Sequence, residues 1–457
     1  MAPESNGITE RLVDYSLGLS YEALPPTVLD RTKQLFLDFL AVAFGGRLLA
    51  ESSESISKGV MELAAGQPGP CTVVAESDRA PAHFAALLNG TYAHSLDFDD
   101  THRDAILHPG APVFATLMAL AERHDGGGRD VLTAAVAAYD VAIKINRAIG
   151  EGAHKRGFHA SATTGIFGAT MGGARLMGLD REQTLNAVGL NGSQAAGSQQ
   201  FLEFGGWNKR LHVGLAAHNA VYALTLARHG FQGASQPLEG RYGYVFSYSA
   251  DGWDTSKIDG LGSRYEVMET GIKPYPCCRY NHGPIDAVAE LTRENRLTAE
   301  DIAAMEVYFS PLGHQVVGEP AEMKRSPTNV VEGQFSAYFA VAATAVDQGY
   351  TWRSYEKLRD PRVKALMDAT TSHPDPSLER FGARVDITTK DGRTLSRDVP
   401  LATGEPERFL TWDDEVAKFN DMAEPALGVD GARRVVEAVS MLEQFDDFSR
   451  FTELLRP

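Results

Sequence analysis

The sequence predicts a mainly helical fold, in which a large helical domain built from both ends of the chain carries a smaller inserted α+β domain. Apolar residues recur at helical spacing through about the first 265 residues. Strand-like runs and a hairpin signal occur only in the middle of the chain, and helical spacing returns over 411–455. We therefore expect a helical domain of residues 1–266 and 405–457 and an α+β lid domain of residues 267–404.

The first long helix is expected to begin at Pro26, which suits a first helical turn, and to end at Gly45-Gly46. Its helical spacing is carried by Val28, Leu29, Leu35, Phe36, Phe39, Leu40 and Ala43. Similar patterns predict helices over 81–94 and 130–149. Asp180, with Gln183 three residues later, predicts a capped helix over about 181–190.

Two predicted helices, 163–177 and 213–229, are unusually rich in glycine and alanine. A glycine inside a helix costs about 1 kcal/mol relative to alanine. Such a density favours close approach of neighbouring helices or of a ligand. In the insert we expect strands over 305–310, 384–389 and 394–399 and helices over 282–295 and 333–346. Lys390-Asp391-Gly392 is the hairpin turn between the last two strands.

Composition limits the partners and the compartment. The 457 residues carry a formal net charge of −17, which argues against nucleic acid and against an anionic membrane surface. A small anionic ligand remains compatible, since a local cationic pocket can exist on an acidic protein. Three cysteines cannot form a disulfide framework and fit a reducing compartment. No targeting segment or membrane span is evident, so we expect a cytoplasmic protein.

The densest group of reactive side chains lies between His94 and His108 and includes Asp97, Asp99 and Asp100. Helix capping followed by a solvated loop is the simpler interpretation. A metal site is a second alternative, because His and Asp both bind divalent ions. The three aspartates do not share one helical face, and no H-E-x-x-H or EF-hand spacing occurs. We expect no metal.

Three further segments place histidines or cations near the small-residue helices and the start of the insert. His159 lies at the expected entrance of the first small-residue helix, where it could be a cap, a core residue or a functional group. Lys209, Arg210 and His212 come just ahead of the second one. A proline-stiffened run carries Lys273, Tyr275, Arg279 and His282. Solvated lysines and arginines are the simpler interpretation of the last two segments.

Taken in order, these blocks resemble the MmgE/PrpD family over nearly the whole chain. The matching blocks are Asn89-Gly90 to Thr101 with His108-Pro109, Gly157-Phe158-His159, Lys209 to Ala217, Lys273 to His282, and Gln334-Phe335-Ser336 to Tyr338. The resemblance implies a helical domain with an α+β lid, a homodimer, and an active site without metal or organic cofactor. Family members act on 2-methylcitrate, cis-aconitate or iminodisuccinate by dehydration, decarboxylation or epimerisation.

The resemblance further implies catalytic roles for Asp97, His108, His159, Lys209 and Lys273, and substrate binding by Thr101, Tyr275, Arg279 and His282. The stretch THRDAIL departs from the bacterial methylcitrate dehydratase pattern, which puts methylcitrate itself in doubt. We expect a cofactor-independent lyase for a small di- or tricarboxylic acid, with an epimerase as the alternative. His108 is the expected acid/base, held by Asp97, and both His108 and Lys273 are expected at a solvent-accessible cleft. His212 is expected in packing or support.

Two function classes compete with this hypothesis. Asp99-Asp100-Thr-His-Arg-Asp104 fits the D-D-x-x-x-D motif of a magnesium-dependent prenyl or terpene synthase, but no second metal motif follows. A non-catalytic polycarboxylate-binding protein would keep the cations without needing histidines as proton carriers.

Overall fold

The computed structural model describes residues 7–249 and 251–457 and is mainly helical, as the sequence predicted. The chain forms two compact units, Met1–Gly271 with Thr411–Pro457, and Ile272–Leu410. The boundaries expected from the sequence lie a few residues earlier in each case, and a lid function for the second unit stays a prediction. Within the described part of the chain, no helix is both long and apolar enough to cross a membrane.

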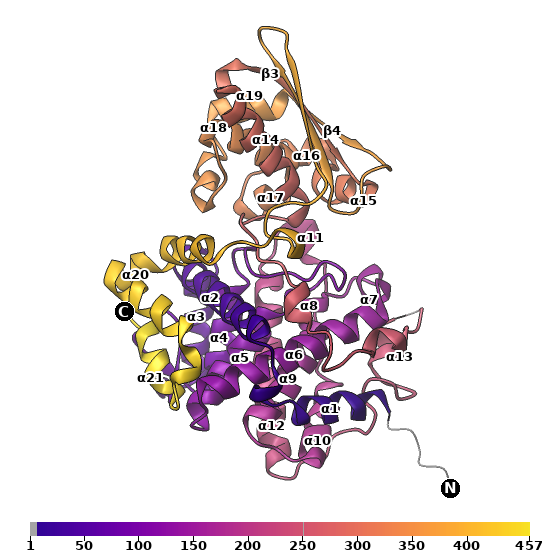
Figure 1. Cartoon of the computed structure of the whole chain (residues 1–457), viewed down its shortest axis with the longest axis vertical. Coiled ribbons are helices and arrows are strands. Elements are labelled where there is room, and N and C mark those ends of the chain that lie inside the picture. The colour runs from indigo at the N-terminus through magenta and orange to yellow at the C-terminus, as the bar shows by residue number, and fades with distance from the viewer. Residues whose placement is uncertain (1–6, 250) are drawn as a thin grey trace. The chain divides into compact units, whose positions relative to one another are not determined.

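The first unit is built almost entirely of helices (Figure 1). Its only sheet in the described residues is the short pair β1 (Cys71–Thr72) and β2 (Arg79–Ala80). The helices are α1 (Ile8–Gly18), α2 (Pro26–Leu49), α3 (Ser53–Leu63), α4 (Ala82–Ala93), α5 (Gly110–Arg123), α6 (Gly128–Ile149), α7 (Gly152–Lys155), α8 (Ala160–Thr163), α9 (Gly165–Leu176), α10 (Arg181–Asn191), α11 (Phe201–Phe204), α12 (Asn208–Arg228), α13 (Tyr244–Tyr248), α20 (Trp412–Ser440) and α21 (Phe448–Thr452).

Close helix packing explains the two small-residue helices. A Cβ placed on Gly168 of α9 would lie 2.5 Å from the carbonyl oxygen of Ala138 in α6, and one on Gly214 of α12 would lie 2.4 Å from that of Leu87 in α4. Neither helix pair could approach as closely with a larger residue at these positions. The predicted close approach of neighbouring helices is therefore confirmed. The capped start of α10 is confirmed too, since Asp180 and Gln183 form a reciprocal capping box.

Three predicted helix boundaries were wrong. Helix α2 runs past Gly45-Gly46 to Leu49. A Cβ on Gly46 would lie 1.9 Å from the Tyr92 carbonyl oxygen, so only glycine allows the backbone near Tyr92 to approach this closely. These glycines serve packing rather than helix termination. The helix expected over 163–177 is divided at Thr164 into α8 and α9. Helix α12 begins at Asn208, so Lys209, Arg210 and His212 lie within its first turns and not ahead of it.

The second unit packs helices against one face of a four-stranded sheet with strand order β4-β3-β5-β6 (Figure 1). The strands are β3 (Ile302–Phe309), β4 (Thr370–Pro374), β5 (Ala383–Thr389) and β6 (Thr394–Val399), and the helices are α14 (His282–Asn295), α15 (Pro311–Gly313), α16 (Ala321–Lys324), α17 (Val330–Gln334), α18 (Ala337–Asp347) and α19 (Pro361–Asp368). The predicted β5–β6 hairpin and α14 are confirmed. The sequence analysis missed β4, which pairs in parallel with β3. The helix expected over 333–346 is divided between α17 and α18.

Candidate active site

The loop between α4 and α5 carries two of the five predicted catalytic side chains, Asp97 and His108. Asp97 has a left-handed backbone conformation with φ of 53°, which Asp tolerates better than most residues. Backbone bridges join Thr101 to Gly271 and His102 to Leu107, and they close the far part of the loop. Asp97, Asp99 and Asp100 are all buried. The alternative of a solvated loop is therefore wrong.

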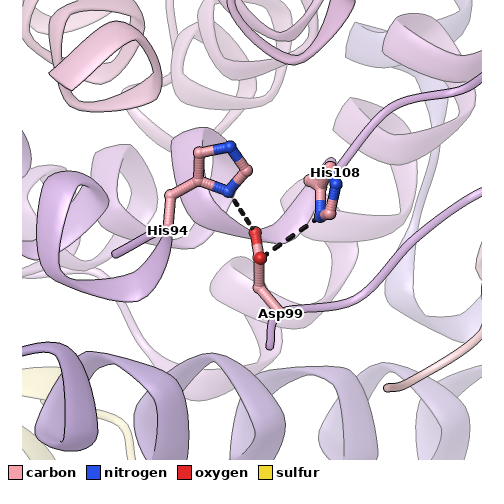
Figure 2. Close-up of side chains that lie close together, drawn as sticks. All are labelled: His94, Asp99 and His108. Carbon is pink, nitrogen blue, oxygen red and sulfur yellow. Dashed lines mark hydrogen bonds and ion pairs between the residues drawn. The ribbon is translucent and has the colours of Figure 1, made fainter. Parts of the chain in front are cut away.

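Asp99 lies between two histidines (Figure 2). One carboxylate oxygen is 2.7 Å from Nδ1 of His94, and the other is 3.2 Å from Nδ1 of His108. Burial alone raises the pKa of Asp99, but the neighbouring His108 and His94 outweigh it and hold that pKa well below its ordinary range. Asp99 is therefore ionised at neutral pH and can orient both imidazole rings.

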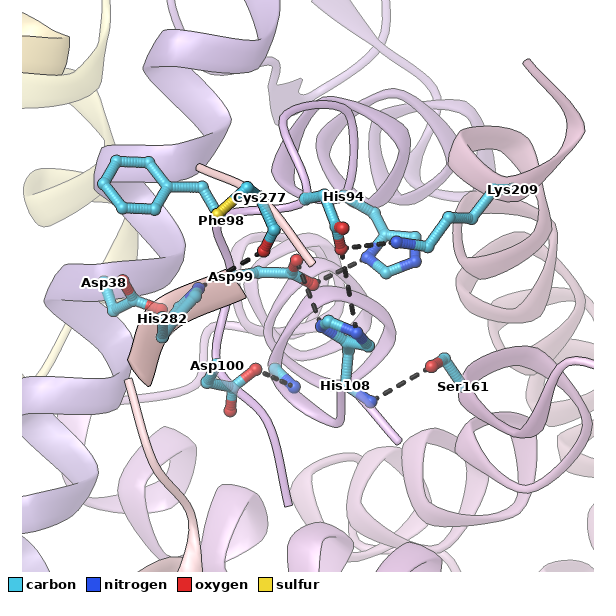
Figure 3. A network of polar contacts seen from close by, with 12 residues as sticks. Asp38, His94, Phe98, Asp99, Asp100, His108, Ser161, Lys209, Cys277 and His282 are labelled. Atoms are coloured by element: carbon cyan, nitrogen blue, oxygen red, sulfur yellow. Dashed lines mark hydrogen bonds and ion pairs between the residues drawn. The ribbon is translucent and has the colours of Figure 1, made fainter. Parts of the chain in front are cut away.

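Lys209 lies near His108 (Figure 3) and forms an ion pair with Asp97. The Lys209 ammonium lies 2.5 Å from Oδ1 of Asp97, and the same oxygen is 4.0 Å from Nε2 of His108. The backbone N–H of His108 donates to Oγ of Ser161 in α8. Asp97 thus lies near His108 as expected, but Asp99 contacts the imidazole more closely. Asp99 is the carboxylate that the sequence analysis did not select for this role.

His159 and His212 complete the group of imidazoles. The His159 ring lies 5.4 Å from that of His94 between centroids, and its Nδ1 is 3.4 Å from Nδ1 of His212. Burial, together with the nearby His94 and Lys209, lowers the pKa of His159 well below its ordinary value. Burial and His94 lower the pKa of His212 to about 4. Both rings are therefore neutral at physiological pH.

A helix-end role for His159 does not survive the local geometry. Helix α8 has only four residues, which gives it little dipole. The backbone N–H of His159 donates to the carbonyl of Gly197. Any contribution of His159 must come from its side chain.

Asp100 points away from the histidines and anchors the loop. It accepts hydrogen bonds from the hydroxyl of Tyr139 at 2.7 Å and from the backbone N–H of Gly110 at 3.0 Å. Burial, Asp38 and Asp99 raise the pKa of Asp100 well above its ordinary value. Asp100 therefore supports the start of α5 and does not join Asp97 and Asp99 at the imidazoles.

One group of side chains in the described residues has the composition of a metal site. Potential ligand atoms of His94, Asp99 and His108 all lie within 4.8 Å of one another. Two imidazoles and one carboxylate suit a divalent ion such as zinc. The same three residues form the hydrogen-bonded and ion-paired chain described above, which needs no ion to satisfy the Asp99 charge. Activity after treatment with a chelator tests the prediction of a metal-free site.

The remaining predicted residues divide between the two units. Thr101 is buried in the first unit, where its backbone pairs with Gly271. Lys273, Tyr275, Arg279 and His282 belong to the second unit. Tyr275 donates to Asp286, Arg279 pairs with Glu405, and His282 Nε2 lies 3.3 Å from the Cys277 carbonyl oxygen. Lys273 is buried, with 3% of its surface exposed, and its place at a substrate cleft stays a prediction.

Several residues around the imidazoles were missed by the sequence analysis. Asp38 of α2 and Lys418 of α20 form a buried ion pair behind Phe98. Ser161 and Tyr139 contact the loop at His108 and at Asp100. A charged residue within an apolar helical run, as Asp38 is within Phe36-Leu-Asp-Phe-Leu40, was the available signal. Its partner, hundreds of residues away, could not be identified from spacing.

Comparison with known proteins finds relatives over nearly the whole length of the chain. Residues 10–255 match the MmgE/PrpD N-terminal domain, and residues 275–444 match the MmgE/PrpD C-terminal domain. Cis-aconitate decarboxylase of Aspergillus terreus is 27% identical over 98% of this chain and 96% of its own length. The Homo sapiens cis-aconitate decarboxylase is 25% identical over 98% and 94%, and the cis-aconitate decarboxylase-like protein oryM of Aspergillus oryzae is 26% identical over 99% and 98%. The chain belongs to the MmgE/PrpD family.

Proposed function

We propose that the chain is a cofactor-independent lyase that decarboxylates a cis-aconitate-like acid. The observation that carries this proposal is the group of His94, Asp99 and His108 beside the Asp97–Lys209 ion pair. It offers a proton carrier oriented by a carboxylate, next to a fixed cation. The full-length similarity to cis-aconitate decarboxylases favours decarboxylation over dehydration of an alkylcitrate-like hydroxy acid.

The chemistry begins with the problem of charge. When the bond between a carboxylate carbon and its neighbour breaks, CO₂ leaves and an electron pair stays on the remaining carbon. That pair delocalises through the neighbouring double bond into the carboxylate at its far end and needs nearby positive charge, which Lys209 supplies as preorganised electrostatics. His108 then delivers a proton to one of the two carbons that share the pair and recovers one from water. Asp99 stabilises the imidazolium form of His108 before this transfer.

The neutral imidazoles have a separate role in the proposal. His159 stays unprotonated in a site that contains Lys209, so its ring can donate or accept a hydrogen bond without adding charge. We assign His159 to orienting a substrate carboxylate or carbonyl group. Thr101, Lys273, Tyr275, Arg279 and His282 keep their predicted roles, with Lys273 as the second cation.

Proton NMR in deuterated water tests the reaction. The enzyme is incubated separately with cis-aconitate, citrate, 2-methylcitrate and iminodisuccinate. Loss of CO₂ with uptake of one deuterium from the solvent into the product supports the proposal. Loss of water identifies a dehydratase. Exchange of the α-carbon proton without loss of CO₂ or water identifies an epimerase. Either result refutes decarboxylation. Saturable binding with no exchange in any of the four acids rejects an enzyme of this class.

We further propose that the protein is a homodimer that associates through the outer face of α12. Leu215 and Tyr222 of this helix are 40% and 50% exposed, and Trp207 just before it is 45% exposed. His218 stacks on Tyr222 and extends the same face towards Phe84 of α4. Scattered exposed apolar residues are ordinary, whereas a continuous row on one helix is typical of an interface. Light scattering should give twice the 49.5 kDa chain mass, and Leu215→Glu with Tyr222→Glu should give the monomer.

A further inference from the structure

A buried lysine on α20, Lys418, contacts the loop between α4 and α5, which we call the catalytic loop because it carries Asp97, Asp99 and His108. Lys418 of α20 is separated from the loop by more than 300 residues, yet its ammonium donates to the backbone carbonyl of Phe98 at 2.8 Å. The ammonium also lies 3.7 Å from the centre of the Phe98 ring and 2.5 Å from Oδ1 of Asp38 in α2. The side chains of Lys418 and Asp38 are 5% and 1% exposed.

The place of contact matters because Phe98 lies between the two site carboxylates in sequence. Asp97 pairs with Lys209, and Asp99 holds His94 and His108. The contact to the Phe98 carbonyl, at the peptide bond that leads into Asp99, fixes the orientation of that peptide. Asp97, with its left-handed backbone, sits on the other side of Phe98 and is held only as long as its surroundings enforce that conformation.

Stability alone does not account well for such a pair. Removing two charges from water costs several kcal/mol per ion, and a buried ion pair is often no more stabilising than apolar residues of the same volume. Asp38 pairs with Lys418 and thereby balances the charge that contacts the loop. The buried pair is thus understandable as a device that holds a cation at one backbone oxygen.

We propose that Lys418 is a positioning residue for the catalytic loop, which it holds through the Phe98 carbonyl so that Asp99 keeps its two imidazoles in place. The assignment rests on the proposed function in one respect, namely that Asp99 and His108 take part in the reaction. Lys418 itself lies behind the loop and acts through Phe98.

The test separates positioning from stability with matched variants. Lys418→Met leaves Asp38 buried beside Asp99 without its lysine partner, so both the unfolding temperature and kcat should fall. Lys418→Met combined with Asp38→Leu removes the whole pair. This double variant should regain most of the unfolding temperature, while kcat stays about 10- to 10²-fold below wild type and KM changes little, because substrate-binding cations are untouched. Wild-type kcat in a well-folded double variant would overturn the proposal.

Lys33→Met is the matched control. Lys33 is also buried on α2, and it donates to the Ser440 carbonyl at the end of α20 at 3.0 Å and pairs with Glu443. It contacts the same pair of helices without reaching the loop. Its loss should lower the unfolding temperature and leave kcat unchanged. An equal loss of kcat in this control would mean that Lys418 has only a structural role and does not position the loop.

A readout without substrate keeps the proposal independent of the reaction. Long-range proton–nitrogen NMR of ¹⁵N-histidine-labelled protein reports the tautomers of His94 and His108. These signals should change in the double variant and not in Lys33→Met, even if no polycarboxylate is turned over and the proposed function fails. Should the Met variants not fold, Lys418→Gln, whose side chain is one bond shorter and uncharged, removes the ion pair with Asp38 and draws the donor back from the Phe98 carbonyl. Lys418→Gln should then shift the same signals, and an unaltered spectrum with wild-type kcat would overturn the proposal.

Discussion

Replacing Asp99 with asparagine removes one charge from the centre of the imidazole group and leaves the shape of the side chain almost unchanged. The pKa of Asp99 is held well below its ordinary range, so the full negative charge is present at neutral pH and is lost in Asp99→Asn. A hydrogen bond to a charged group contributes about 1.5–3 kcal/mol. Because about 1.4 kcal/mol corresponds to a tenfold change in rate, loss of the contact to His108 alone should lower kcat by about 10- to 10²-fold.

The assay is the initial rate of CO₂ release at neutral pH with saturating cis-aconitate, measured beside the unfolding temperature of each variant. Asp104→Asn is the control, since Asp104 lies on the same loop but is exposed. Its carboxylate makes only a long ion pair, 4.0 Å from Nε of Arg103. Its kcat should match that of wild type. If Asp99→Asn keeps kcat within about twofold of wild type while folding normally, Asp99 does not orient His108 and the proposed acid/base group is wrong.

Further predictions concern the other site residues. His108→Ala and Lys273→Ala should each lower kcat by at least about 10²-fold. Lys273→Ala should also weaken the binding of polycarboxylate inhibitors. A His108→Ala variant with normal turnover would reject His108 as the proton carrier. Turnover should survive exhaustive dialysis against EDTA, and activity that returns only with a divalent ion would instead support metal binding by His94, Asp99 and His108. The pKa of His212 in the folded protein lies at about 4, below the ordinary value of about 6.5. The contribution of neutral His212 to the free energy of unfolding is therefore complete above about pH 6.5 and is lost as the pH falls towards 4. His212→Gln should therefore flatten the fall in unfolding temperature over that range, whereas His229→Gln on the exposed end of the same segment should not.

Sequence reasoning identified helices well where apolar periodicity was uninterrupted. The exact span of α14 and the small-residue packing of α9 and α12 followed from local pattern. Glycine misled the prediction at Gly45-Gly46, because a helix-ending residue and a close-packing residue look alike until the neighbouring Tyr92 backbone is in place. Strand β4 was missed because its partner β3 lies more than 60 residues earlier, and a parallel pair needs no turn signal between its strands.

The site shows the same division between local and long-range information. Sequence blocks placed Asp97, His108, His159 and Lys209 in one functional group, and the structure brings these four residues together in the first unit. The choice between Asp97 and Asp99 as the partner of His108 depends on which way each side chain leaves a tight loop. That direction is set by a left-handed residue at Asp97 and by Lys418, and neither is apparent from residue spacing.

The two site carboxylates also bear on how an acidic protein could hold an acidic substrate. Asp97 balances the charge of Lys209, and Asp99 faces two imidazoles. A substrate carboxylate near Lys209 must share that ammonium with Asp97, which weakens ground-state binding. In the proposed reaction, loss of CO₂ adds negative charge before His108 has delivered its proton. Lys209, already held by Asp97, needs no rearrangement to meet that charge, so the arrangement favours the transition state over the bound substrate.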